Sequence, residues 1–150
     1  GLKREDAMEA AVRRLFDRYE RFFMRALGGD LDESEAASLY AAELIAATPA
    51  GVTSGKNDDA FLAAMAQGHE RYRAIGTKAM KVRAVRVSPI DELHCVAHVA
   101  WKATYARDGR DDVSIDFVVH YLVQARGGET TVFGWVSGDD EARLKKHRVG

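Results

Sequence analysis

The clearest pattern in the chain is a set of three apolar runs in its C-terminal half, at 93–105, 113–125 and 130–136. The runs are rich in Val, Trp, Tyr and Phe, and the polar segments 107–111 and 126–129, with their Asp-Gly and Gly-Gly pairs, separate them. Runs of this length and composition, interrupted by turn residues, are typical of β-strands joined by short hairpins. The pattern therefore predicts an antiparallel meander of three strands.

The two longer runs each have an apolar face at odd-numbered positions and a mixed face at even-numbered positions. Because residues directly opposite each other share a face, the numbers of two partners must sum to an even value. A tight two-residue turn at Asp108 and Gly109 is therefore excluded unless a bulge intervenes. A turn centred on Gly109 predicts four cross-strand pairs: Trp101 with Phe117, Ala97 with Tyr121, Lys102 with Asp116, and His98 with His120.

Upstream of the meander, apolar residues spaced three and four apart predict two amphipathic helices. The first covers 6–27 and ends at the pair Gly28-Gly29. The second is capped by the acidic segment 57–59 and runs to Ile75, where Gly76 ends it. Helices at the start of the chain followed by an antiparallel sheet make an α+β domain.

Shorter elements lie around these helices. Residues 78–88 form a predicted strand whose polar positions change parity, which indicates a bulge or a strong twist near Ala84. Because the residue before a proline is extended, any helix upstream must end before Pro49. The other predicted elements are a short helix from Asp32 to about Tyr40, a short strand or helix end at 43–47, and a C-terminal helix that starts at 139–141.

Composition and charge exclude several classes of protein. The 150 residues are the size of one compact domain, and no linker or repeat divides them, so we expect a single domain over 1–150. With 22 basic and 23 acidic residues, the net charge of −1 gives no reason to expect nucleic acid or a membrane surface as a partner. The single Cys excludes an internal disulfide, and no apolar run could span a bilayer. We expect a cytoplasmic protein without a cofactor.

Three histidines of the meander raise the question of a metal site. His94 and His98 lie four residues apart on one strand, a separation of roughly 13 Å, which is too far for one ion. His98 and His120 face each other, but no sure third ligand joins them, so no metal site is predicted. This even-numbered face also carries apolar side chains, which predicts a homodimer through the outer face of the sheet. These apolar residues are Val96, Ala100, Val118 and Leu122.

The order of elements carries a resemblance to a known family. Tyr19 lies on the long first helix, Pro49-Ala50-Gly51 follows the short second helix, Gly55 leads into the next helix, and the meander follows. In this order the chain resembles the nuclear transport factor 2-like superfamily, which includes ketosteroid isomerases, scytalone dehydratase and polyketide cyclases. The resemblance covers almost the whole chain. It implies a cystatin-like cone, in which a curved antiparallel sheet wraps around N-terminal helices that close a pocket, and dimerisation through the outer sheet face.

The resemblance also implies roles for individual residues. In the isomerases a tyrosine on the first helix donates a hydrogen bond to a developing oxyanion, and Tyr19 matches it. The isomerase base is an aspartate immediately before the proline of a Pro-x-Gly segment, where this chain has Thr48, whose hydroxyl cannot accept a proton at neutral pH. The protonated acid on the second meander strand is matched best by Tyr121, a phenol that can donate a hydrogen bond. Asp116 lies several residues too early and on the wrong face, so steroid-type isomerisation is not expected.

Three hypotheses about function remain. The leading one is a domain that binds a small apolar molecule in an apolar pocket. The second is an isomerase, cyclase or dehydratase whose acid or base lies elsewhere, with His69 and Glu43 in reserve. The third is an adaptor whose outer sheet face binds another protein. The direction of Trp135 stays open because the parity of the last run is unclear. The residues predicted to contact a ligand are Tyr19, Phe23, Thr48, Met65, Trp101, Phe117, Tyr121 and Trp135.

Overall fold

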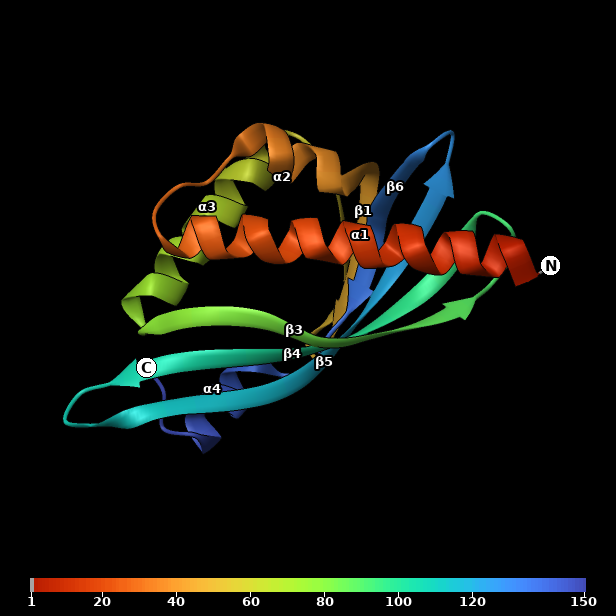
Figure 1. Cartoon of the computed structure of the whole chain (residues 1–150). Coiled ribbons are helices and arrows are strands. Elements are labelled where there is room, and N and C mark those ends of the chain that lie inside the picture. The colour runs from red at the N-terminus through yellow and green to blue at the C-terminus, as the bar shows by residue number, and fades with distance from the viewer. Residues whose placement is uncertain (1) are drawn as a thin grey trace.

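The computed structural model describes residues 2–150, with side chains from Glu5 onward, and shows a strongly curved sheet that wraps around helices (Figure 1). This arrangement confirms the predicted α+β class. The elements follow in the order α1 (Leu2–Leu27), α2 (Glu33–Leu39), β1 (Tyr40–Thr48), β2 (Gly51–Lys56), α3 (Asp59–Ala74), β3 (Thr77–Pro89), β4 (His94–Arg107), β5 (Arg110–Arg126), β6 (Glu129–Val136) and α4 (Asp140–Lys146).

The six strands form one sheet in the order β2-β1-β6-β5-β4-β3. Strands β1 and β6 run parallel, and the other neighbours are antiparallel. Helix α1 lies against the sheet beside α2 and α3, while α4 lies next to the long β4–β5 hairpin (Figure 1). The core forms where the apolar face of α1 packs on the odd-numbered rows of β4 and β5, and its fully buried residues include Val12, Leu15, Phe16, Val99 and Val123.

The register predicted for the β4–β5 hairpin is confirmed. Trp101 pairs with Phe117, and Ala97 pairs with Tyr121, as the parity argument requires. The turn is nevertheless the tight pair Asp108-Gly109, since Arg107 pairs with Arg110. Inside the strands the numbers of paired residues sum to an even value, whereas a two-residue turn requires an odd one. A bulge between Tyr105 and Arg107 adds the extra residue that makes the two compatible. Gly109 takes a φ of 63°, which a residue with a side chain rarely adopts.

A second bulge lies near the predicted position, and its extra residue forms the ion pair with Asp116. The pairing of β3 with β4 moves from Val82 directly to Ala84, so Arg83 is the extra residue. Lys102 does lie opposite Asp116 in the register. The ion pair of Asp116, however, is with Arg83, at 3.6 Å between Nη1 and Oδ2. Arg83 therefore has no partner on β4, and its long side chain reaches across β4 to Asp116 on β5.

The start of the sheet differs from the sequence prediction. Segment 43–47 belongs to a longer strand, β1, which begins at Tyr40 directly after α2. Strand β2 was not predicted, since Gly55 was expected to lead straight into a helix. This strand pairs with β1 through a turn in which Thr48 lies opposite Gly51. All residues of β2 are exposed at the edge of the sheet, so their sequence has no buried face to reveal a strand.

The last strand resolves the direction of Trp135. Pairing of β5 with β6 shifts between Leu122 and Val123, which leaves Phe133 outside the regular register. Val132 and Trp135 consequently both face the concave side, although their numbers differ in parity. Trp135 lies opposite Tyr121. A register shift of one residue explains why alternation alone did not assign the faces of β6.

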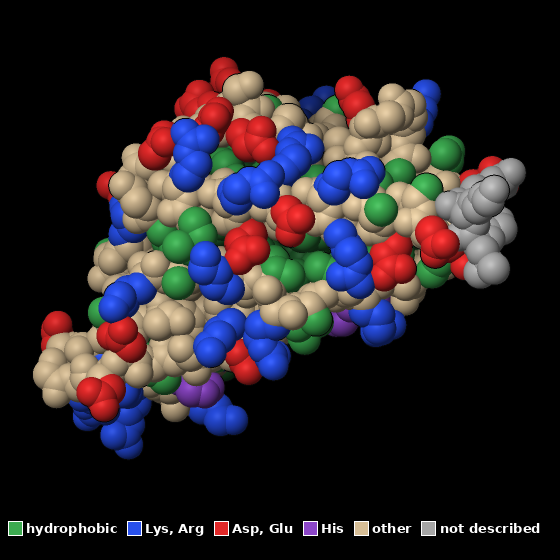
Figure 2. All heavy atoms as spheres, viewed as in Figure 1, with side chains coloured by type: hydrophobic (Ala, Val, Ile, Leu, Met, Phe, Trp, Pro, Cys, Tyr) green, Lys and Arg blue, Asp and Glu red, His purple; other side chains and the backbone are tan. Residues whose placement is uncertain are grey.

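The visible surface is mixed in charge. On the face that presents α1, basic and acidic side chains alternate over the helix and the strands below it, with apolar side chains between them (Figure 2). Among residues 2–150, none of the helices combines the length and apolar character that crossing a membrane requires.

Candidate functional site

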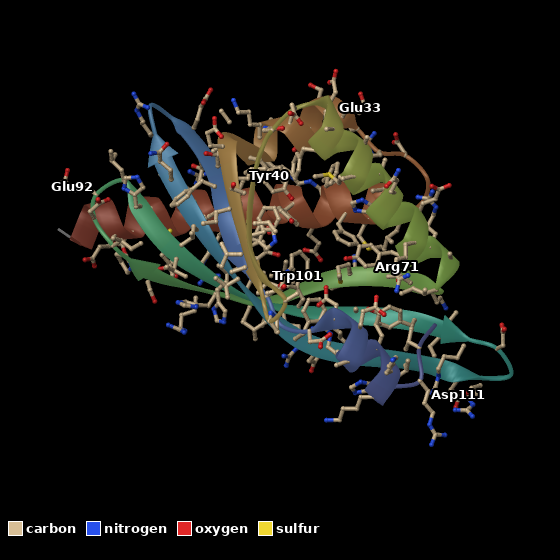
Figure 3. The ribbon with its side chains drawn as sticks, turned by 180° about the vertical axis from the view of Figure 1, so that it is seen from behind. Glu33, Tyr40, Arg71, Glu92, Trp101 and Asp111 are labelled. Atoms are coloured by element: carbon tan, nitrogen blue, oxygen red, sulfur yellow. The ribbon has the colours of Figure 1, made fainter. Side chains whose placement is uncertain are left out.

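Two adjoining cavities lie between the helices and the concave face of the sheet. The sheet-side cavity, about 210 Å³, is bordered by β3, β4, β5 and α4. The helix-side cavity, about 290 Å³, opens along α3. Tyr19, Phe23, Tyr72 and Trp135 line both cavities, so we treat the two as one aromatic pocket. Figure 3 shows Trp101 and Tyr40 directed into this interior, whereas the labelled Glu33, Glu92 and Asp111 lie at the periphery.

Secondary structure brings the aromatic side chains of the pocket together. Tyr19 and Phe23 are four residues apart on α1 and therefore share one face of the helix. Trp101 and Tyr121 come from odd positions of neighbouring strands and are 2% and 5% exposed. The ring centroid of Tyr19 lies 5.8 Å from that of Trp101 and 5.7 Å from that of Tyr121. The pocket wall is thus a continuous aromatic surface that helix and sheet build jointly.

A chain of hydroxyl groups crosses this wall. The Tyr40 hydroxyl donates to the Tyr19 hydroxyl at 2.7 Å, and Trp101 Nε1 donates to the Tyr121 hydroxyl at 3.1 Å. The hydroxyls of Tyr19 and Tyr121 interact with each other as well. Desolvation by burial raises the pKa of each of the three tyrosines. All three stay protonated near neutral pH, and the chain of bonds leaves one hydroxyl proton for a ligand oxygen.

His69 presents a free nitrogen beside this wall. Its Nδ1 lies 3.0 Å from the carbonyl oxygen of Met65, so Nδ1 carries the proton and donates it. In the neutral ring Nε2 is then an unprotonated acceptor, and this buried atom has no hydrogen-bond partner among the residues that the structure describes. The ring is 5% exposed, lines the helix-side cavity and lies 4.6 Å from the ring centroid of Phe23. Burial lowers the pKa of His69, which keeps Nε2 available as a base.

The far end of the sheet-side cavity carries the charged residues of the pocket. The guanidinium carbon of Arg143 lies 4.0 Å from the ring centroid of Phe117, and Nη2 donates to Asp140 Oδ1 at 2.6 Å. Arg143 Nε is buried and has no hydrogen-bond partner in the described part of the chain. The hydroxyls of Tyr72 and Tyr105 lie near this pair. Burial and the charge of Asp140 raise the pKa of Tyr72 to about 12.

The structure brings most of the predicted ligand-contacting residues together. Thr48 is the exception: it lies exposed at the end of β1, where its hydroxyl accepts a hydrogen bond from the Ala50 backbone N–H. The expectation that Thr48 lies in the pocket is therefore wrong, because the β1–β2 turn carries this residue away from the helices. The other seven predicted residues line one or both cavities: Tyr19, Phe23, Met65, Trp101, Phe117, Tyr121 and Trp135.

Of the two reserve candidates, His69 turns inward and Glu43 does not. Glu43 is exposed and lies 3.9 Å from Lys56 of the edge strand. Sequence reasoning did not assign Tyr40 or Arg143 to the pocket. Tyr40 was placed at the end of a helix, and Arg143 belongs to a basic helix end, so neither stood out as a pocket residue.

The outer face of the sheet carries the paired histidines. His98 Nδ1 lies 2.7 Å from His120 Nδ1, and the hydroxyl of Ser88 lies 2.9 Å from His98 Nε2. Both ring nitrogens of His98 are thereby engaged with neighbouring side chains. Within the described part of the chain, no group of three His, Cys, Asp or Glu residues is placed to hold one metal ion.

Comparison with solved structures places this geometry in a large group. An NTF2-like protein with a cystatin-like fold from Novosphingobium aromaticivorans is similar at a TM-score of 0.67, with 16% identity over 98% of this chain and 92% of that chain. A candidate scytalone dehydratase from the same species has a TM-score of 0.66 and 12% identity over 91% and 86%. The hexachlorocyclohexane dehydrochlorinase LinA-type3 from Novosphingobium barchaimii has a TM-score of 0.65 and 11% identity over 91% and 88%.

At these identities the likeness shows the fold and not an activity. No protein with a curated description matches the sequence. A family profile described as NTF2-like protein (DUF6841) matches residues 6–140, which is most of the chain. The chain therefore belongs to this NTF2-like family.

Proposed function

We propose that this protein binds a small, mainly apolar molecule in the aromatic pocket and that His69 removes a proton from the bound molecule. One observation carries the proposal: beside a ligand-sized cavity, Nε2 of His69 is a buried, unprotonated nitrogen that no group of the described chain, 2–150, contacts through a hydrogen bond. Buried polar atoms in folded proteins nearly always have a partner, so an unpaired one beside a cavity supports a functional role. The reaction class is an isomerisation or an elimination.

The chemistry begins at a carbon next to a carbonyl group, or at a carbon next to the one that carries a leaving group. Nε2 takes the proton, and the electrons of the C–H bond move onto the ligand. The positive charge on the ring is stabilised because Nδ1–H donates to the Met65 carbonyl. A carbonyl oxygen that becomes negative can accept the free proton of the Tyr19–Tyr121 pair as a hydrogen bond. Return of the proton to a different carbon completes an isomerisation, and loss of the leaving group completes an elimination.

The names of two structural neighbours are compatible with elimination chemistry. One is a candidate dehydratase and the other a dehydrochlorinase. Their similarity to this chain shows the fold alone, so the proposal rests on His69 and not on them.

The test follows deuterium uptake by a ketone that fits an aromatic pocket. The probe is 2-tetralone, whose C–H bonds beside the carbonyl exchange slowly in D2O and can be followed by proton NMR. We expect the wild-type protein to accelerate this exchange. His69→Asn should abolish the acceleration while retaining ketone binding, because the Asn amide can still donate to the Met65 carbonyl. Ketone binding by thermal shift separates loss of the base from loss of the pocket.

His147 offers a matched control. Its Nδ1 also lies 3.0 Å from the carbonyl oxygen four residues earlier, that of Arg143, but the side chain does not line the pocket. His147→Asn should leave the exchange rate unchanged. If the wild-type protein binds 2-tetralone without accelerating exchange, or if His69→Asn exchanges as fast as wild type, His69 is not the base. The chain would then be a ligand-binding domain.

We also propose a homodimer through the outer face of β4 and β5. Val118 exposes 47% of its surface on this face, beside the engaged pair His98 and His120. Val118 shares this face with the half-buried Val96, Ala100 and Leu122, and a contiguous apolar patch favours a protein contact. A two-fold axis would bring the same residues of both subunits together. An adaptor that binds another protein would use the same face, and the isolated chain would then be monomeric.

A further inference from the structure

The far end of the sheet-side cavity has an excess of unused hydrogen-bond donors. The Nε–H group of Arg143 is buried, and no atom of the described residues accepts its proton. The guanidinium cannot swing away freely, because it is stacked on the Phe117 ring and tied to Asp140 through Nη2. Its side chain is 19% exposed, so water reaches it only in part. A held, partly desolvated cation with a free N–H is a favourable position for an acceptor from a ligand.

Two tyrosines add donors at the same place. Tyr72 and Tyr105 line the cavity together with Arg143, and within the described residues neither hydroxyl takes part in a side-chain hydrogen bond. Tyr72, Tyr105, Asp140 and Arg143 all line this one cavity, and burial raises the pKa of both phenols. Both hydroxyls remain protonated at neutral pH. The one carboxylate nearby, Asp140, is 51% exposed and already accepts a bond from Arg143.

We propose that this end of the pocket is a carboxylate subsite and that the ligand is a small aromatic or alicyclic acid. Its rings would lie against Trp101 and Phe117, and its carboxylate would accept from Arg143 Nε and from the Tyr72 or Tyr105 hydroxyl. One delocalised cation with neutral donors suits a singly charged, planar group. A phosphate would require more positive charge. Among the described residues that line this cavity, Arg143 is the one with a cationic side chain.

This inference deepens the proposed function, because both place the ligand in the aromatic pocket. The test compares two probes of the same shape, 2-naphthoate and its uncharged amide 2-naphthamide, by isothermal titration calorimetry at pH 7.5. We expect wild type to bind the acid at least about tenfold more tightly than the amide, since a charged acceptor bound by Arg is worth more than a neutral one. Arg143→Gln should remove this preference, mainly by weakening binding of the acid.

Lys145→Gln is the matched control, because it removes one positive charge from an exposed position of the same helix. It should leave the preference for the acid intact. Tyr105→Phe provides a second variant that keeps the ring and removes a single donor. It should weaken binding of the acid more than binding of the amide, even if Arg143→Gln fails to fold.

Three results would overturn the subsite: equal binding of the two probes by wild type, no measurable binding of 2-naphthoate, or an acid preference that survives in folded Arg143→Gln. Failure of the proposed function looks different. In that case 2-tetralone would take up deuterium at the same rate with His69→Asn as with wild type, while the preference for 2-naphthoate persisted. Conversely, deuterium exchange that depends on His69, together with equal binding of the acid and the amide, would support His69 as the base and contradict the carboxylate subsite.

Discussion

The hydroxyl of Tyr40 donates a hydrogen bond to the hydroxyl of Tyr19 at 2.7 Å, and this bond joins the first residue of β1 to the middle of α1. This bond orients the Tyr19 hydroxyl. Because Tyr19 accepts the proton of Tyr40, its own hydroxyl proton points away from Tyr40 and can be donated to another group. Tyr121 is held in the same way by Trp101. The polar groups of the pocket are thus oriented before a ligand binds, which reduces the entropy that binding must offset.

Removing the Tyr19 hydroxyl should destabilise the fold more than removing the Tyr40 hydroxyl. Tyr19→Phe leaves the Tyr40 donor buried without an acceptor and should cost about 1–3 kcal/mol of unfolding free energy. Tyr40→Phe leaves Tyr19 with its proton free to reach Tyr121 and should cost about 1 kcal/mol. Urea unfolding of both variants and of the double variant is the measurement. Strictly additive losses would show that the two hydroxyls do not interact.

His69 should make stability depend on pH. Burial, followed by the positive charge of Arg73, lowers its folded-state pKa below the ordinary value of 6.5. The unfolded chain therefore takes up a proton near pH 6.5 that the folded chain does not, and the unfolding free energy falls as the pH drops through that value. Above it, the contribution is fully present. Wild type should lose more stability than His69→Asn between pH 7.5 and pH 5.5 in urea unfolding, whereas identical losses would contradict a depressed pKa.

Gly134 should not tolerate a side chain. A Cβ at this position would lie 2.6 Å from Ile45 Cγ2 and 2.8 Å from the Ile45 carbonyl oxygen, where β1 and β6 run side by side. We expect Gly134→Ala to lower the unfolding free energy by about 1–3 kcal/mol through overpacking. Gly138 has open space around its Cβ position, so Gly138→Ala serves as the control and should be nearly neutral. Equal stability of the two variants in urea would contradict the close approach of the strands.

The proposed dimer should weaken in acid. Burial lowers the pKa of His98, with smaller contributions from Arg86 and His120, so protonation adds an unfavourable positive charge to this face. Sedimentation at pH 8 should show a dimer at micromolar concentration, and at pH 5.5 a larger share of monomer. A monomer at pH 8 excludes the dimer, whereas equal association at both values excludes only the histidine effect.

A substitution on the same face tests the dimer independently of pH. Val118→Lys should produce a monomer at pH 8, because Val118 lies on the outer face and is 47% exposed. Ile90→Lys is the control: Ile90 is also exposed, at 61%, but lies in the connection between β3 and β4. A dimer that survives Val118→Lys would place the interface elsewhere.

The sequence by itself determined the meander and the register of its first hairpin, β4–β5. Alternation in β4 and β5 has a period of two, and a slip of one residue would turn the whole apolar row to solvent, so Trp101 opposite Phe117 follows from pattern alone. The helix starts were equally local, since Asp32 and Asp58 each accept a hydrogen bond from a backbone N–H three residues on. Edge strand β2 was not predicted, because all its residues are exposed and its sequence therefore has no alternation of apolar and polar positions.

Only the tertiary structure decided which polar atoms share the pocket. Periodicity assigns His69 to a face of α3, but it does not say that Nδ1 is taken by Met65 while Nε2 is left without a partner. Nor does a basic helix end reveal that Arg143 stacks on Phe117, a residue of strand β5. These relationships join elements that are distant in sequence. They depend on how a curved sheet, its bulges and four helices close around one space, and the one-dimensional pattern of hydrophobic and polar residues does not encode that closure.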